Sequence, residues 1–136
     1  MSFVIDASIA LAWCFSDEAS PAADLALGRL ATEEALVPAI WPLEVTNGLR
    51  TAGRRGRLDM ADLPRIRDLL IALPIRVETM DLATALGEVS DLARSLELTA
   101  YDAAYLALAA KRGLALATID ENLKRACRTA GVKIAE

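Results

Sequence analysis

Short apolar runs alternate along the chain with longer segments in which apolar residues recur every three or four positions. A short continuous run is typical of a buried strand, and the longer spacing is typical of a helix with one buried face. The runs predict five strands, at residues 3–5, 35–37, 75–77, 114–117 and 132–134. The longer segments predict helices at residues 8–15, 21–30, 42–52, 59–73, 81–96, 100–112 and 121–130.

Residues that cap or stop helices stand at several of these boundaries. Ser8 is the expected N-cap of the first helix and Ser20 that of the second. Either Asp59 or Asp62 is expected to start the fourth helix, and Gly113 to end the sixth. The order of elements is therefore better defined than any one boundary.

Strands that alternate with helices pair in parallel through right-handed crossovers. We therefore expect an α/β fold: an α/β/α sandwich around a central parallel sheet of about five short strands. The chain has 136 residues, and 54% of them are hydrophobic, which is enough for one core. Residues 1–136 are expected to form a single domain.

The amino-acid composition excludes several kinds of catalytic and metal site. The chain has no histidine, which excludes Ser-His-Asp and Cys-His nucleophile pairs and any zinc site that needs imidazole. Two cysteines, Cys14 and Cys127, lie in apolar helical patterns and are interpreted as core residues of a reducing compartment. No basic stretch precedes the first apolar run and no apolar segment is long enough to span a bilayer, so we expect a cytoplasmic protein that does not enter a membrane.

Four carboxylates share one expected place in this fold. Asp6 ends the first strand and Asp120 follows the fourth, while Glu44 and Asp102 lie in the first turns of helices beside these strands. Ligands of open parallel sheets bind at the carboxyl ends of the strands. Each acid also has a simpler interpretation, since aspartate caps helices and either acid favours the positive end of a helix dipole. Together, in largely apolar segments, they indicate a cation site.

Without histidine or clustered cysteine, the implied cation is a hard one that prefers oxygen ligands, Mg²⁺ or Mn²⁺. Water activated by such an ion can attack a phosphodiester, and a carboxylate can orient or deprotonate that water. Ser8, Asn47 and Thr118 fall near the acids in this arrangement, where they could orient water or phosphate. Alternatively, Ser8 and Thr118 only cap helices or turns.

Charge is unevenly distributed along the chain. Fifteen lysines and arginines against nineteen acids give a formal net charge of −4, yet residues 50–67 hold six arginines and only two aspartates. A local basic patch can bind a polyanion although the protein as a whole is acidic. The alternatives are a solvated surface or a salt bridge to an acidic partner. The candidate phosphate contacts are Arg50, Arg54, Arg55 and Arg57.

Four motifs in order closely resemble the PIN-domain family, and more narrowly the VapC toxins of type II toxin-antitoxin modules. They are FVIDAS at 3–8, PLEVTNGLR at 42–50, TAYDAAYLALA at 99–109 and ATIDENL at 117–123. Any one of them would be weak, but all four in order span the whole chain. Leu123 stands where relatives often carry an aromatic residue.

The resemblance implies a toxin endoribonuclease that depends on Mg²⁺ or Mn²⁺ and hydrolyses RNA phosphodiester bonds. Its acidic quartet, both catalytic and metal-binding, would be Asp6, Glu44, Asp102 and Asp120, with Ser8 and Thr118 in support. Relatives generally form homodimers and cut structured RNA such as transfer or ribosomal RNA. A cognate antitoxin inhibits them, often by placing an arginine in the acidic pocket.

Other classes of protein place carboxylates at strand ends. A receiver-like Mg²⁺-binding signalling module needs a phosphoacceptor aspartate at the third strand, which here reads Ile75-Arg76-Val77-Glu78. A haloacid-dehalogenase phosphatase needs a second aspartate that Asp6-Ala7-Ser8 lacks. A non-catalytic RNA-binding or partner-binding relative is a third alternative, which only an assay separates from an enzyme.

Overall fold

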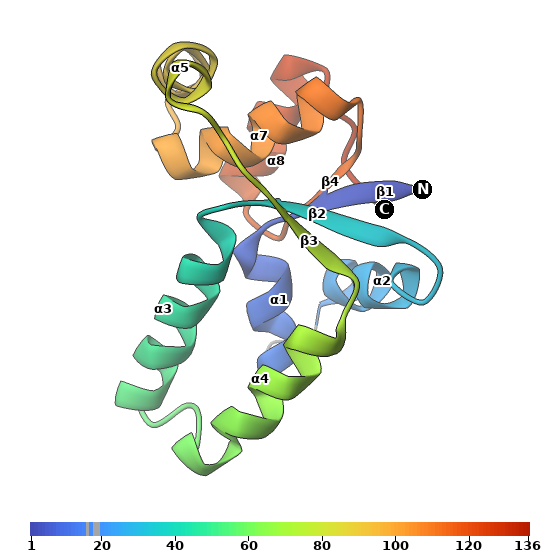
Figure 1. Ribbon diagram of the computed structural model, residues 1–136, viewed down its shortest axis with the longest axis vertical. Coiled ribbons are helices and arrows are strands. Elements are labelled where there is room, and N and C mark those ends of the chain that lie inside the picture. Colours follow the sequence, from blue (N-terminus) through green and yellow to red (C-terminus); the bar gives the residue numbers. More distant parts are fainter. Residues whose placement is uncertain (16, 18–19) are drawn as a thin grey trace.

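The computed structural model describes residues 1–15, 17 and 20–136 and is built around a parallel sheet. Its strands are β1 (Ser2–Ile5), β2 (Glu34–Pro38), β3 (Ile75–Glu78) and β4 (Leu116–Ala117), in the order β3-β2-β1-β4. Phe3 pairs with Ala35 on one side of β1, and Val4 pairs with Leu116 on the other. The predicted α/β class is confirmed (Figure 1).

The predicted fifth strand is wrong. Among the described residues the sheet has four strands, and residues 132–134 contribute a single bridge between Leu116 and Ile134. Leu116 donates to the Lys133 carbonyl and accepts from the Ala135 amide, both at 2.9 Å. With β4 only two residues long, there is no further length of partner strand for this C-terminal segment to pair with.

Helices cover both faces of the sheet (Figure 1). One layer holds α1 (Ala7–Cys14), α2 (Pro21–Arg29), α3 (Trp41–Arg54), the short helix η1 (Met60–Asp62) and α4 (Leu63–Ala72). The opposite layer holds α5 (Leu82–Thr84), η2 (Ala85–Val89), α6 (Ser90–Ser95), α7 (Ala100–Arg112) and α8 (Glu121–Ala130). This is the predicted sandwich.

One helix start departs from the sequence pattern. The N-cap of α1 is Asp6, whose side chain accepts from the Ile9 amide, and not the predicted Ser8. The predicted start of the fourth helix is confirmed, because Asp59 caps η1 and Asp62 is the N-cap residue of α4, which begins at Leu63. The helix predicted over residues 81–96 is one helical segment in which five residues, Ala85–Val89, widen to π-helical bonding.

The core lies between β1 and the two helical layers. Phe3, Val4 and Ile5 are fully buried, as are both residues of β4 to within 2%. Helix α7 is buried from Ala103 to Ala109, and its alanines let its backbone pack close to β1 and β2. Cys127 is buried and Cys14 half-buried, and both are free thiols. Among the described residues, no helix combines the length and apolar character needed to cross a membrane.

Candidate active site

Asp6 lies at the carboxyl end of β1, where the chain turns into α1. Its side chain is buried, with 6% of the residue surface exposed. The Ser8 hydroxyl donates to Asp6 Oδ1 at 2.6 Å, and the Thr118 hydroxyl donates to Asp6 Oδ2 at 2.5 Å. The Ile9 amide also donates to Oδ1, at 3.3 Å. Both carboxylate oxygens are therefore oriented by donors from two segments of the chain.

The same two hydroxyls join β1 to the turn that follows β4. Ser8 Oγ accepts from the Ile119 amide at 3.1 Å, and Thr118 Oγ1 accepts from the Asp120 amide at 3.0 Å. Each hydroxyl thus donates to Asp6 and accepts from the backbone. The structure places both predicted supporting residues beside Asp6, and Ser8 does so in place of capping α1.

Burial raises the pKa of Asp6 to about 6, above its ordinary value of 3.8. The hydrogen bonds from Ser8, Thr118 and Ile9 oppose this shift, and the nearby charge of Asp102 adds to it. An ionised carboxylate at this position is therefore held at a cost that a bound cation would offset.

Asp102 connects the four predicted acids electrostatically. It lies in the first turn of α7, where its amide donates to the N-cap hydroxyl of Thr99 at 3.1 Å. Burial raises its pKa, and the charges of Asp120 and Glu44 raise it further. Asp102 also raises the pKa of Asp6, so its charge interacts with each of the other three acids. The structure brings the predicted quartet into one electrostatic neighbourhood at the carboxyl ends of β1 and β4.

Glu44 is held by a residue that the sequence pattern did not single out for the site. Tyr105, only 1% exposed, donates its hydroxyl to Glu44 Oε1 at 2.5 Å. Burial and this bond to Glu44 raise the pKa of Tyr105, so the phenol remains a donor. The position of Tyr105 three residues after Asp102 puts both on one face of α7, and that spacing is the signal that could have found it.

Asp120 combines two of the predicted roles. Its Oδ1 accepts from the Asn122 amide at 2.8 Å and from the Leu123 amide at 3.2 Å, which caps α8. Its charge still reaches Asp102. Asn47 is exposed on α3, one turn after Glu44, and none of the hydrogen bonds given for the described residues joins it to an acid.

The acids fit a hard cation by chemistry and charge more than by preformed geometry. All of the side-chain atoms that could bind an ion here are carboxylate or hydroxyl oxygens, which suit Mg²⁺ and Mn²⁺. However, in residues 1–15, 17 and 20–136 no three histidine, cysteine, aspartate or glutamate side chains converge closely enough to hold an ion. Asp6 and Glu44 instead bind hydroxyl groups, so side-chain rotation would have to accompany ion binding.

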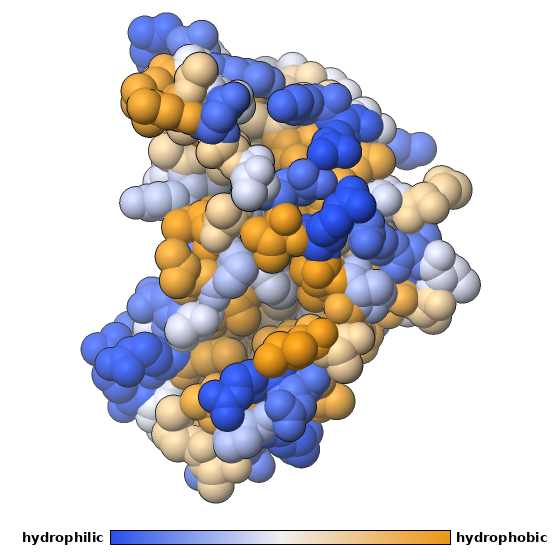
Figure 2. Space-filling view, in the orientation of Figure 1, coloured by the Kyte–Doolittle hydropathy of each residue, from blue (hydrophilic) through white to orange (hydrophobic). Residues whose placement is uncertain are grey.

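The candidate arginines lie at the C-terminal part of α3 and just after it, where strongly hydrophilic side chains gather at the lower left of Figure 2. Arg50, Arg54 and Arg55 are exposed. Arg57 forms an ion pair with Asp17 at 3.3 Å and lies over the Phe15 ring, 4.7 Å from its centroid. Arg57 is therefore anchored to the protein, whereas α3 presents the other three to solvent.

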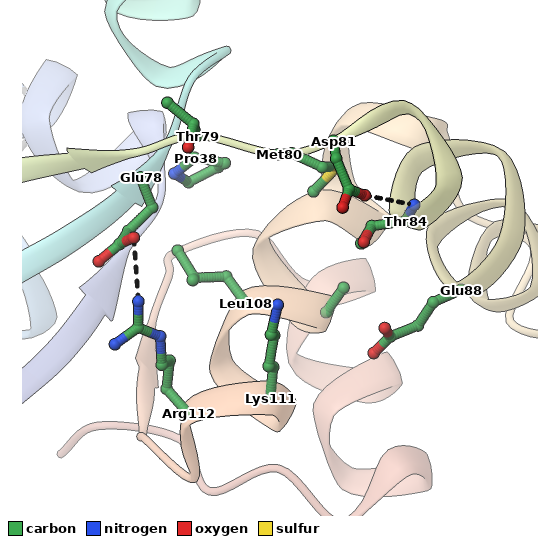
Figure 3. Close-up of a pocket in the computed structure, with 11 residues that line it drawn as sticks. Pro38, Glu78, Thr79, Met80, Asp81, Thr84, Glu88, Leu108, Lys111 and Arg112 are labelled. Atoms are coloured by element: carbon green, nitrogen blue, oxygen red, sulfur yellow. Dashed lines mark hydrogen bonds and ion pairs between the residues drawn. The ribbon is translucent and has the colours of Figure 1, made fainter.

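A separate pocket of about 200 Å³ lies where β2 and β3 end (Figure 3). Two of its acids have partners within the lining: Arg112 bonds Glu78 at 3.0 Å, and Asp81 accepts from the Thr84 amide at 2.8 Å. None of the four predicted acids lines it. This pocket is therefore not part of the acidic site.

Comparison with known proteins decides the family. The sequence model of the PIN domain matches residues 3–129. The chain belongs to the PIN-domain family. The similarity of the four motifs to PIN domains is thereby confirmed over nearly the full length.

Relatives of this PIN-domain protein come from both bacteria and archaea. Ribonuclease VapC9 of Mycobacterium tuberculosis is 35% identical over 121 residues, which are 88% of this chain and 87% of that protein. Ribonuclease VapC3 of Pyrobaculum aerophilum is 32% identical over 123 residues, 90% and 92% of the two chains. The crystal structure of PAE2754 from Pyrobaculum aerophilum matches with a TM-score of 0.71 at 26% identity, covering 93% of this chain and 84% of that one. The PIN-like fold expected from the sequence is confirmed.

Proposed function

We propose that this PIN-domain protein is the toxin of a type II toxin-antitoxin pair and an endoribonuclease that depends on Mg²⁺ or Mn²⁺. The observation that carries the proposal is the site at the carboxyl ends of β1 and β4, where Ser8 and Thr118 hold the buried Asp6, and Tyr105, three residues after Asp102, holds Glu44. Relatives that match nearly the whole chain are named VapC ribonucleases.

The four acids would hold the ion, which, when bound, supplies a Lewis acid for phosphate oxygens and lowers the pKa of water. Ser8 and Thr118 orient both oxygens of Asp6 before an ion binds. Asp102, half-buried with a raised pKa, would accept a proton from the attacking water. Tyr105 holds Glu44 toward the same site.

The same proposal covers partners and location. The substrate is RNA, with transfer or ribosomal RNA as the target class, and the exposed arginines of α3 contact its phosphates. A cognate antitoxin protein inhibits the enzyme at the acidic site. The protein acts in the cytoplasm as a homodimer. A receiver-like module is disfavoured because the strand order β3-β2-β1-β4 differs from the 2-1-3-4-5 order of receivers.

Cleavage of a structured RNA by the purified protein tests the proposal. Wild type is expected to cut in Mg²⁺ or Mn²⁺ and to stop in chelator, and Asp6→Asn and Asp102→Asn are expected to be inactive while still folded. Asp91→Asn is the matched control, because Asp91 is a solvent-exposed acid on α6. Full activity in chelator, or in either site variant, would overturn the proposal.

A further inference from the structure

A cavity of about 350 Å³ lies between α1 and α3, next to the acidic site. Ser8 is part of its wall, and the hydroxyl of Ser8 donates to Asp6 at 2.6 Å. Ile119 lines it too, and its amide donates to Ser8 Oγ at 3.1 Å. Two of the residues that orient the turn beside Asp6 therefore also form the cavity wall, so a molecule in the cavity lies one side chain away from Asp6.

The lining combines apolar side chains with positive charge. Leu11, Phe15 and Ile119 give an apolar surface, and Arg55 and Arg57 stand beside it. Arg57 is held over the Phe15 ring and paired with Asp17, which fixes it as part of the wall. Arg55 is exposed at the C-terminal end of α3. An apolar surface beside a guanidinium suits a nucleotide, since the base can lie on the apolar side chains while arginine binds phosphate.

Gly48 sets the width of this cavity. A Cβ built on Gly48 would lie 2.6 Å from Leu11 Cδ1 and 2.7 Å from Cδ2. Both atoms are at the end of a flexible side chain, so an alanine there would displace the end of Leu11, which lines the cavity. The absence of a side chain at position 48 therefore keeps Leu11 where it is.

The four candidate arginines differ in whether they line this cavity. Arg55 and Arg57 line it, whereas Arg50 lines a different groove, between α3 and α4. Arg54 lies next to Arg55 in sequence but lines neither cavity. A phosphate that follows a base seated near Ser8 would thus meet Arg55 and not Arg54.

We propose that this cavity is the binding subsite for the RNA nucleotide next to the phosphate that is cleaved. The base lies against Leu11, Phe15 and Ile119, and the phosphate of that nucleotide binds Arg55. The inference rests on the proposed ribonuclease function, because RNA is the ligand. It adds the place where the flanking nucleotide sits and the residues that contact it.

Binding of a short fluorescent RNA, measured by anisotropy in the Asp6→Asn protein, tests this without cleavage. Adding Arg55→Ala is expected to weaken binding about tenfold, and adding the neighbouring Arg54→Ala less than about twofold. An abasic nucleotide at the flanking position is expected to weaken RNA binding to the Asp6→Asn protein. When Gly48→Ala is added and the melting temperature is unchanged, the abasic RNA and the intact RNA are expected to bind equally well. Equal effects of Arg54→Ala and Arg55→Ala, with no effect of the abasic nucleotide on the Asp6→Asn protein, would overturn the subsite.

The two proposals fail separately in this design. If Arg55→Ala weakens binding selectively but wild type cuts no RNA in Mg²⁺ or Mn²⁺, the subsite stands and the ribonuclease proposal fails. If wild type cuts RNA but the two arginine variants bind alike and the abasic nucleotide changes nothing, only the subsite fails.

Discussion

The hydroxyl of Tyr105 on α7 donates a 2.5 Å hydrogen bond to Glu44 on α3, a residue 61 positions away in the sequence. The two helices lie in opposite layers, so this bond links them at the carboxyl-end edge of the sheet (Figure 1). It also keeps a carboxylate directed inward that would otherwise be free to turn toward water.

Replacing Tyr105 with phenylalanine removes this bond and keeps the ring. Because a hydrogen bond to a charged group is lost, we expect Tyr105→Phe to lower the free energy of unfolding by about 1–3 kcal/mol and to reduce RNA cleavage. Tyr101→Phe is the control, since Tyr101 lies on the same helix and is 57% exposed. Urea unfolding and initial cleavage rates measure both effects. Identical behaviour of the two variants would show that the bond has no role.

The hydroxyl of Thr118 is expected to matter more than its methyl group. Thr118→Val keeps the shape of a side chain that is 1% exposed but removes the donor to Asp6 and the acceptor for the Asp120 amide. We expect a loss of about 1–3 kcal/mol in the free energy of unfolding, because a buried polar group is left unsatisfied. Thr118→Ser keeps the hydroxyl and should lose less than Thr118→Val. The reverse order of the two variants, by urea unfolding, would contradict this assignment.

Stability in chelator should depend on pH through Asp6. Its pKa is about 6 in the folded protein and 3.8 ordinarily, so the folded state binds this proton more tightly. The contribution of Asp6 to stability is then complete below about pH 4 and is lost as pH rises through about 6. We expect Asp6→Asn to be more stable than wild type at about pH 7.5, by up to about 3 kcal/mol, and no more stable at about pH 4. A difference that does not change with pH would contradict the burial of an ionised Asp6.

Divalent ions should stabilise the folded protein. A ligand that binds only the native state at 100 times its dissociation constant adds about 2.7 kcal/mol. We therefore expect Mn²⁺ to raise the melting temperature of wild type and of Asp91→Asn, and to leave that of Asp102→Asn unchanged. A calorimetric melt with and without Mn²⁺ gives the answer. An equal rise in all three proteins would place the ion elsewhere.

The positions of Asp6 and Asp120 could be predicted because strand order alone sends them to one edge of a parallel sheet. Capping and site chemistry seemed to be alternatives for these two residues in the sequence, whereas in the structure both carboxylates cap helices and also belong to the acidic cluster. A helix cap uses mainly one carboxylate oxygen, so the negative charge of the side chain still acts on the neighbouring acids.

Three features of the structure could not be predicted from the sequence pattern. Residues 132–134 have the composition of a strand, but only one pair forms because β4 offers two residues. The π-helical stretch from Ala85 to Val89 keeps nearly helical periodicity and so leaves no mark in the sequence. The spacing from Asp102 puts Tyr105 on the same face of α7, but its bond to Glu44 depends on how α3 and α7 pack across the sheet.

The central claim, that the acidic cluster makes this protein an endoribonuclease, is tested most directly by mapping RNA 5′ ends after brief expression of wild type beside Asp6→Asn. We predict discrete new ends in a structured RNA with wild type and none with Asp6→Asn at equal protein level. The same ends in both samples, or no new ends with wild type, would contradict the claim.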